Sequence, residues 1–238
     1  MARPAPVPLL SGFLCNLRSV TTQSRGIFIA FEGGDGAGKS TQAARLAGAL
    51  ESLGHTVLRT REPGGTPIGE KLRSLVLDHG HGTIDARTEA LMFAASRAAH
   101  AHQVIRPALA EGTVVITDRY IDSSVAYQGA GRGLGTADVR SLNEWATENL
   151  EPDLTVLLDV RPEDGRERRT AGNAGEDRLE SEPDDFHSRI RHAFLELAAA
   201  KPGAYLVLPA KDPVEELAAR VLERVRQLLE TTVPGGRP

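Results

Sequence analysis

The sequence predicts an α/β fold in which a five-stranded parallel sheet carries helices on both faces. Short apolar runs alternate along the chain with longer amphipathic stretches, which is the order expected of parallel strands joined by helices. The apolar runs are almost free of polar residues, which is typical of strands that are buried on both faces. With 238 residues, of which 40% are hydrophobic, the chain is long enough to bury one large core.

Five runs rich in β-branched, aliphatic or aromatic residues are the predicted strands, at residues 27–31, 56–60, 113–118, 154–160 and 204–209. The first, IFIAF, leads into a glycine-rich loop, and the third, TVVITD, ends in an acidic residue. An amphipathic stretch follows each strand, and the predicted helices cover residues 39–53, 87–111, 137–149, 183–200 and 214–230. No repeat or interdomain linker interrupts this order.

One segment breaks the alternation of strands and helices. Residues 161–183, RPEDGRERRTAGNAGEDRLESEP, are polar and dense in charges of both signs. They are longer than most connections between a strand and a helix. The segment is either a solvated excursion or a lid that closes over a binding site, and we place the candidate lid at about residues 161–182.

The two ends of the chain differ from its centre. Residues 1–25 are proline-rich and contain three arginines but no acidic residue. We predict a disordered extension or a start codon placed too early, with a targeting segment as the alternative. The folded domain is expected at residues 26–231, followed by a disordered tail at residues 232–238.

Composition argues against several classes of function. The formal net charge of −4 gives no electrostatic reason to expect a nucleic acid partner. No apolar run reaches the roughly 18 residues that a membrane span requires, so no membrane partner is expected. Cys15 is the single cysteine, so an intrachain disulfide is impossible and a reducing compartment, the cytoplasm, is expected.

A glycine-rich loop follows the first predicted strand, and residues 33–40 fit the pattern G-x-x-x-x-G-K-[ST] between a strand and a helix. Glycines allow successive backbone N–H groups to turn inward and form a cup for phosphate oxygens. The helix that follows adds its positive N-terminal end. Lys39 would reach the β- and γ-phosphates, and the Ser40 hydroxyl would ligate Mg²⁺. The predicted ATP-binding residues are Gly33, Gly34, Asp35, Gly36, Ala37, Gly38, Lys39, Ser40 and Thr41.

The phosphate loop does not by itself say what happens to the nucleotide. A GTPase would carry an [NT]-K-x-D segment, and the nearest string, AKDP at residues 210–213, lacks the required residues. A motor NTPase would usually be larger. A small kinase that transfers the γ-phosphoryl group to a second substrate is therefore favoured, and a protein that binds nucleotide without chemistry is the alternative.

Two features indicate a second, anionic substrate. TREPGGTPIG at residues 60–69 places a glycine turn at the end of the second strand, where open α/β sheets bind ligands; the alternative is a turn that only starts a helix. Phe93 and Arg97 are four residues apart in a predicted helix and therefore share a face. Alone, Phe93 would be a core residue and Arg97 a surface residue, but together they could stack on a base and hydrogen-bond to it.

The third strand ends in Asp118, Arg119 and Tyr120. An acidic residue directly after such a strand stands where this kind of fold holds Mg²⁺, directly or through water. Arg119 would then point into the cleft, where it could bridge the donor and acceptor phosphates. The alternative is a simple ion pair at the end of the strand.

Together these motifs resemble the thymidylate kinase (dTMP kinase) family. FEGGDGAGKST, TREPGGT, MFAASR, DRYIDSSVAYQG and EDRLE, followed by FHSRIRHAFLELA, occur in the family's order within residues 26–230. The resemblance implies the fold of the P-loop nucleoside monophosphate kinases, the reaction ATP + dTMP → ADP + dTDP with Mg²⁺, and a homodimer formed through helices that flank the site. Kinases that act on UMP, CMP or a deoxynucleoside are the alternatives within the enzymes.

The resemblance also implies roles for single residues in holding dTMP. Phe93 would stack on thymine, Arg97 would hydrogen-bond its O4, and Ser124 or Gln128 would face the pyrimidine.

Three further residues would surround the sugar and the phosphate. Asp35 would contact the 3′-hydroxyl, Tyr127 would lie against C2′ and disfavour ribonucleotides, and Arg119 would hold the acceptor phosphate.

The family has two classes that differ in the source of the arginine used in the transition state. One class has an arginine inside the phosphate loop, where this chain has Gly36, and the other has arginines in the lid. Residues 161–178 contain Arg161, Arg166, Arg168, Arg169 and Arg178, so the chain resembles the lid-arginine class of bacteria. We expect Arg168 or Arg169 to act with Lys39 and Arg119 in catalysis, in the manner of an arginine finger, which elsewhere raises rates by roughly 10³ to 10⁵.

Overall fold

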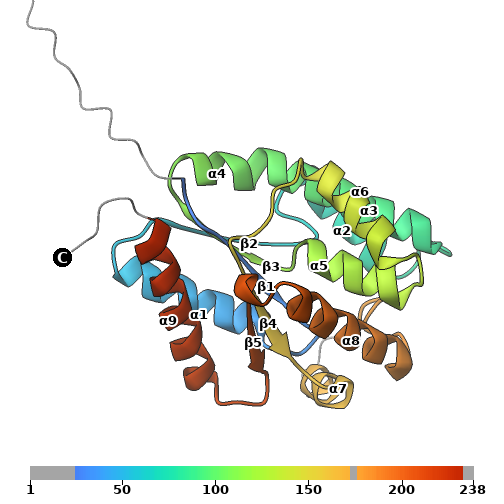
Figure 1. Ribbon diagram of the computed structural model, residues 1–238. Helices are drawn as coiled ribbons and strands as arrows, with labels where there is room; N and C mark the ends of the chain where they lie inside the picture. The colour runs from blue at the N-terminus through green and yellow to red at the C-terminus, as the bar shows by residue number, and fades with distance from the viewer. Residues whose placement is uncertain (1–24, 172–175, 233–238) are drawn as a thin grey trace, which may run out of the picture.

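A computed structural model of the chain describes residues 25–171 and 176–232. Within these ranges the centre is one sheet of five parallel strands in the order β2-β3-β1-β4-β5 (Figure 1). The strands are β1 (Phe28–Glu32), β2 (Val57–Arg61), β3 (Val114–Asp118), β4 (Leu154–Asp159) and β5 (Tyr205–Pro209). The predicted sheet is confirmed, and each strand begins and ends within one residue of its predicted bounds.

Helices connect the strands in turn. They are α1 (Lys39–Ser52), α2 (Pro67–Leu77), α3 (Ala86–His100), η1 (Ala101–Ile105), α4 (Arg106–Ala110), α5 (Ile121–Ser124), η2 (Val125–Gly131), α6 (Thr136–Ala146), α7 (Pro162–Thr170), α8 (Asp184–Ala200), η3 (Pro202–Ala204) and α9 (Val214–Thr232). Of these, η1 and η2 are π-helical and η3 is a 3₁₀ turn.

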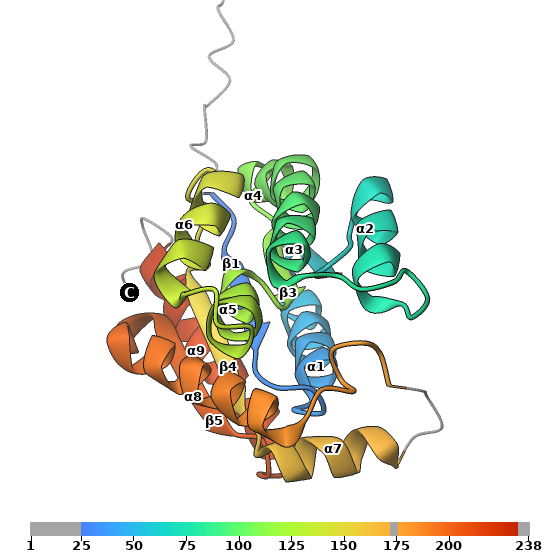
Figure 2. The same ribbon diagram turned by 90° about the vertical axis from the view of Figure 1, so that its right-hand side faces the viewer.

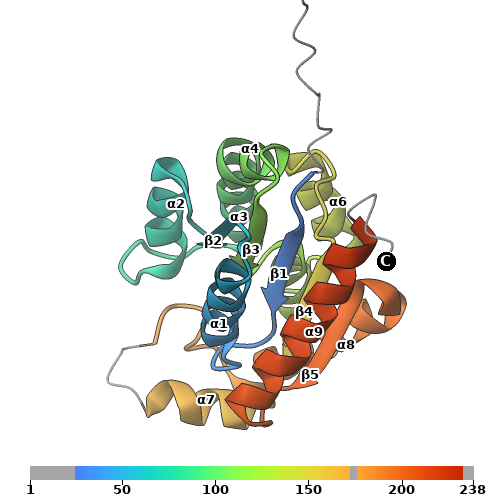
Figure 3. The same ribbon diagram turned by 90° about the vertical axis from the view of Figure 1, so that its left-hand side faces the viewer.

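Both faces of the sheet are apolar and covered by helices. Along β1, Ile29 and Phe31 join the core that includes α1 and α9, whereas Phe28 and Ala30 join the core that includes η1, α4 and α5. Figure 3 shows α1 and α9 in front of the sheet, and Figure 2 shows α5 and α8 on the opposite side. Burial on both faces explains why the strands are continuous apolar runs.

Two predicted helices differ from the structure. The stretch predicted as one helix at residues 87–111 consists of α3, η1 and α4 in succession, with the π-helical turns in the middle. The helix predicted at residues 137–149 ends at Ala146. Beyond its end, Glu148 and Asn149 have φ angles of 52° and 57°, which a right-handed helix does not allow.

The sequence prediction missed α2, the short α5 with η2, and α7, which lies inside the predicted lid. Glu163 and Asp164 stand in the first turn of α7, and Arg168 and Arg169 stand in its last turn. Charges of this order oppose the helix dipole at both ends and stabilise a short helix. Gly165 is the residue of α7 that is buried, so the helix has no apolar stripe for periodicity to detect.

Parts of three predictions lie outside the described residues. They are residues 1–24 of the N-terminal extension, residues 172–175 of the lid and residues 233–238 of the C-terminal tail. Among the helices that are described, none combines the length and the apolar character that crossing a membrane requires.

Candidate active site

The phosphate loop joins β1 to α1 at the carboxyl edge of the sheet and packs between β4 and α7. Gly33 has a φ angle of 133°, and a Cβ there would lie 2.3 Å from the carbonyl oxygen of Leu158. Gly36 has a φ angle of 79°, and a Cβ there would lie 2.4 Å from the carbonyl oxygen of Gly165 in α7. Both positions therefore require glycine, and the loop backbone touches α7 directly.

A cavity of about 450 Å³ opens above this loop. Six of the nine predicted ATP-binding residues line it: Asp35, Gly36, Gly38, Lys39, Ser40 and Thr41. The remaining three, Gly33, Gly34 and Ala37, lie outside its lining; the carbonyl groups of Gly33 and Gly34 instead accept hydrogen bonds from Lys39.

Lys39 is held against the loop that it is expected to serve. Its Nζ donates to the carbonyl oxygens of Gly33 at 3.1 Å and Gly34 at 2.9 Å, and the residue is buried. Burial and the nearby Arg119 lower the pKa of the ammonium group. A bound anion would offset both effects, so the ammonium group is suited to a phosphate.

Ser40 and Asp118 bring two oxygen ligands together at the start of α1. Ser40 Oγ donates to Asp118 Oδ2 at 2.5 Å, and both residues line openings next to the loop. Within the described ranges, no three His, Cys, Asp or Glu side chains gather as a metal cluster. A hydroxyl and one carboxylate still fit Mg²⁺, which typically takes one or two protein carboxylates and completes its shell with phosphate oxygens and water.

Arg119 lies at the point where the phosphate loop meets a second cavity. It has a φ angle of 70°, in the left-handed region that non-glycine residues adopt uncommonly. Its Nη1 donates to Ser123 Oγ at 2.9 Å and to the carbonyl oxygen of Gly33 at 3.2 Å. Its Nη2 donates to Asp35 Oδ1 at 2.5 Å and to the Tyr127 hydroxyl at 3.1 Å.

Asp35 and Tyr127 complete this network. The Tyr127 hydroxyl donates to Asp35 Oδ2 at 2.6 Å. Burial alone would raise the pKa of Asp35, but Arg119 and Lys39 outweigh it and the pKa lies below its usual range. Asp35 is therefore an ionised acceptor, and burial next to that carboxylate raises the pKa of Tyr127.

The second cavity, of about 140 Å³, brings together every residue predicted to bind the acceptor substrate. These residues are Asp35, Phe93, Arg97, Arg119, Ser124, Tyr127 and Gln128. They come from the phosphate loop, α3, the end of β3, α5 and η2, so the cavity forms only when the sheet brings these segments together.

Arg97 is a buried residue, and the alternative that it is a surface residue is wrong. Its Nε donates to Glu62 at 2.6 Å, and its Nη1 donates to Ser124 Oγ at 2.9 Å and to Asn143. Its Nη2 donates to the carbonyl oxygen of Tyr120 at 3.0 Å. A guanidinium has five N–H groups, so one on Nη2 is left for a ligand.

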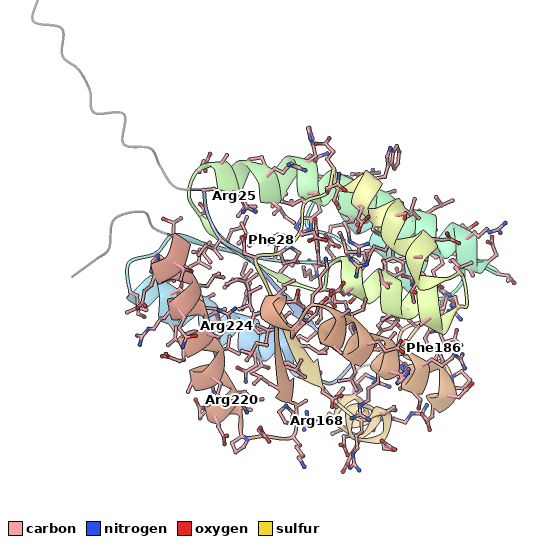
Figure 4. All side chains as sticks on the ribbon, viewed as in Figure 1. Arg25, Phe28, Arg168, Phe186, Arg220 and Arg224 are labelled. Carbon is pink, nitrogen blue, oxygen red and sulfur yellow. The ribbon has the colours of Figure 1, made fainter. Side chains whose placement is uncertain are left out.

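The five arginines of the predicted lid have different surroundings. Arg168 lines the cavity above the phosphate loop, and its guanidinium donates to the carbonyl oxygens of Gly36 at 3.3 Å and Ala210 at 3.1 Å (Figure 4). Arg169 donates to the carbonyl oxygen of Asp35 at 3.2 Å and lies beside a small cavity behind the loop. Among the described residues, four of the five form ion pairs with carboxylates: Arg161 with Asp164, Arg166 with Asp184, Arg169 with Glu176, and Arg178 with Glu89.

Sequence reasoning missed Arg73 of α2, which lines both cavities. Its Nη1 donates to the carbonyl oxygen of Pro63 at 3.1 Å. Burial and the nearby Arg61 lower its pKa, so an anion between the two cavities would be stabilised there. The TREPGGTPIG motif pointed to this region, but without α2 nothing in the pattern directed Arg73 toward it.

Comparison with known proteins gives one consistent result. A family model described as thymidylate kinase matches residues 31–221. The thymidylate kinase of Clavibacter michiganensis subsp. michiganensis is 54% identical over 204 residues, which cover 86% of this chain and 96% of that protein. That of Leifsonia xyli subsp. xyli is also 54% identical, over 85% of this chain and 96% of its own length. A crystal structure of thymidylate kinase from Ehrlichia chaffeensis matches with a TM-score of 0.69 and 31% identity, over 85% of this chain and 99% of that one.

Proposed function

This chain belongs to the thymidylate kinase family, and we infer that it transfers the γ-phosphoryl group of ATP to dTMP, giving ADP and dTDP. The observation that carries the inference is the pair of adjoining cavities, one above a phosphate loop and one lined by an aromatic ring and a guanidinium. Asp35 and Arg119 line both of them. The two phosphates of an in-line transfer would therefore meet beside Arg119, and the sugar of the acceptor would lie beside Asp35.

The loop of residues 33–41 would hold the triphosphate of ATP through its backbone N–H groups and the N-terminus of α1. Lys39 would exchange its two carbonyl partners for phosphate oxygens as the nucleotide enters. Ser40 and Asp118 would hold Mg²⁺ by their 2.5 Å pair of oxygens. When bound there, the ion would neutralise charge on the β- and γ-oxygens.

The acceptor phosphate would lie between Arg119 and Arg73, the two arginines that line both cavities. Two negatively charged groups must approach each other in this reaction, and preorganised cations reduce their repulsion without reorganising. The ionised Asp35 would accept a hydrogen bond from the 3′-hydroxyl. The ring of Tyr127, buried beside it, would leave no room for a 2′-hydroxyl.

The base would enter between Phe93 and the polar groups of α3, α5 and η2. Phe93 offers a ring at the edge of an apolar cluster, and the remaining N–H of Arg97 would donate to O4 of thymine. Ser124 already accepts from Arg97, so its own hydroxyl hydrogen is available to the ligand, and Gln128 lines the same wall.

We propose that α7 is part of the predicted lid and that Arg168 is its catalytic arginine. In support, Arg168 is the one of the five lid arginines that reaches the cavity of Lys39 and Ser40. Arg169 is turned toward the back of the loop and pairs with Glu176 at 3.5 Å. Gly36 leaves the space that α7 occupies, because a Cβ at that position would lie 2.4 Å from the carbonyl oxygen of Gly165. The loop therefore has no room for an arginine there, and α7 supplies one instead.

A homodimer is proposed on the outer face of α2, α3 and α6. These helices pack side by side (Figure 1), and each exposes a large apolar side chain: Leu75 is 43% exposed, Leu91 57% and Trp145 81%. A second copy of the chain would cover this face. Sedimentation velocity should give a dimer for the wild type and a monomer for Leu91→Asp; a monomeric wild type would contradict the proposal.

The single Cys15 suits the reducing cytoplasm in which we place the enzyme.

The test of function is a coupled assay of ADP release from purified protein with ATP and Mg²⁺. dTMP should be turned over far faster than UMP, CMP or thymidine. Faster turnover of UMP or CMP would favour a different nucleoside monophosphate kinase. Nucleotide binding without ADP release for any acceptor would support a non-catalytic protein instead.

A further inference from the structure

Glu89 is a fully buried acidic residue in α3, in contact with Gln128, which lines the second cavity. Gln128 Nε2 donates to its Oε1 at 3.0 Å. Arg132 Nε and Nη2 donate to its two oxygens at 3.2 Å and 3.1 Å. Arg178 Nη2 donates to Oε2 at 2.5 Å. A buried carboxylate is therefore held by two guanidinium groups and one amide.

The contact with Glu89 determines which end of the Gln128 amide faces the ligand. An ionised carboxylate can only accept hydrogen bonds, so Gln128 must present its NH₂ group to Glu89. Its carbonyl oxygen is then the atom left for the cavity that Gln128 lines. Among the described residues, that oxygen has no hydrogen-bond partner. It is also not fully enclosed by protein, so a ligand in the cavity can reach it.

The polarity of this amide matches one class of pyrimidine. Thymine and uracil carry a donor, N3–H, where cytosine carries an unprotonated acceptor nitrogen. We propose that Glu89 is a positioning residue: it keeps the Gln128 carbonyl oxygen turned toward the base, so that the pocket accepts a hydrogen bond from N3–H and rejects cytosine. This inference rests on the proposed role of the cavity as the dTMP site.

The two arginines explain how Glu89 stays a pure acceptor inside the protein. Burying an unpaired carboxylate is costly, and paired guanidinium groups offset that cost. Arg132 is itself fixed by Glu182 at 2.6 Å and lies 4.8 Å from the ring centre of Phe186, which Figure 4 labels on α8. The amide of Gln128 is thus anchored to a braced charge cluster and cannot turn over without losing its partner.

Glu89→Gln tests the proposal directly, because a glutamine at position 89 can offer its own NH₂ group and let the Gln128 amide reverse. We expect kcat/KM for dTMP to fall about tenfold, mainly through KM, and the preference for dTMP over dCMP to narrow about tenfold, as loss of one matched hydrogen bond predicts. The KM for ATP should not change. Glu182→Gln is the matched control, since it removes the other carboxylate from Arg132 without touching Gln128, and its preference should equal that of the wild type.

Glu89→Asp is a second test variant, for the case in which Glu89→Gln does not fold because the buried charge is lost. It keeps the charge for Arg132 and Arg178, whose long side chains can follow, but withdraws the oxygen from Gln128, so the preference should narrow partially. A thermal melt establishes that each variant is folded. Wild-type preference in the folded Glu89 variants would overturn the inference.

A double-mutant cycle separates positioning from general damage. If Glu89 acts through the amide, adding Glu89→Gln to Gln128→Leu should leave the dTMP to dCMP preference of Gln128→Leu unchanged. Additive effects on that preference would overturn the inference. If Gln128→Leu alone leaves the KM for dTMP unchanged, the assignment of the base pocket fails instead.

Discussion

Glu32, the last residue of β1, makes the stability of this protein depend on pH in a predictable direction. It is buried, and it accepts hydrogen bonds from the backbone of Tyr120 at 2.8 Å and from Ser123 Oγ at 2.6 Å. Burial, followed by the charge of Asp122, raises the pKa of Glu32 from 4.5 to about 7. The folded protein therefore retains a proton that the unfolded chain releases at lower pH.

The sign follows from this difference in bound protons. Between pH 4.5 and about 7 the folded state binds more protons at Glu32 than the unfolded state does, so this residue's contribution to stability falls as the pH rises. It is fully present below pH 4.5 and lost above pH 7. A shift of this size corresponds to about 3 kcal/mol, or about 6–12 °C in Tm for a chain of this length.

Glu32→Gln removes the ionisation and keeps the shape, because an amide resembles the protonated acid. The free energy of unfolding should be measured by urea denaturation from pH 4 to pH 8.5 for wild type and variant. As the pH rises from 4 to 8.5, the free energy of unfolding of the variant should increase by about 3 kcal/mol relative to that of the wild type. A constant difference between the two at low pH does not affect this result. Glu51→Gln on the exposed surface of α1 is the control and should track the wild type. Parallel curves for wild type and Glu32→Gln would refute the reasoning.

Three further predictions concern the active site. Arg168→Ala should lower kcat by at least about 10³ with little change in KM, whereas Arg169→Ala should lower it far less; equal losses in single-turnover experiments would contradict the choice between them. Arg97→Ala should raise the KM for dTMP strongly and leave the KM for ATP nearly unchanged, in protein whose folding is checked by circular dichroism; equal changes in both would remove its role at the base. Gly36→Ala should displace α7 and lower kcat, since its Cβ would lie 2.4 Å from a carbonyl oxygen. Gly38→Ala is the control and should lower kcat less, because Gly38 also has a positive φ, 91° against 79° for Gly36, but nothing lies within 4 Å of its added Cβ.

Local patterns in the sequence were sufficient to predict the sheet and the phosphate loop. A strand buried on both faces is visible in the sequence as a continuous apolar run, and a position that requires a positive φ angle is visible as a glycine. Helical spacing paired Phe93 with Arg97, the resemblance added Gln128, and the structure brings these three predicted base-binding residues into one cavity. α7 was missed for a physical reason: it is held by charges at its ends and by contact with the phosphate loop, neither of which produces an apolar period.

The buried acidic residues mark the limit of local inference. Glu89 precedes an apolar stretch in an ordinary amphipathic helix, and nothing near it in sequence distinguishes it from a surface residue. Its partners Arg132 and Arg178 lie 43 and 89 residues away, and Ser123 lies 91 residues from Glu32. Whether such a carboxylate is solvated or enclosed depends on pairings that only the assembled sheet creates. The chemistry of the carboxylate depends on the same pairings. A solvated carboxylate titrates as it does in water, whereas an enclosed one can orient a neighbouring amide, as Glu89 does, or hold a proton near neutral pH, as Glu32 does.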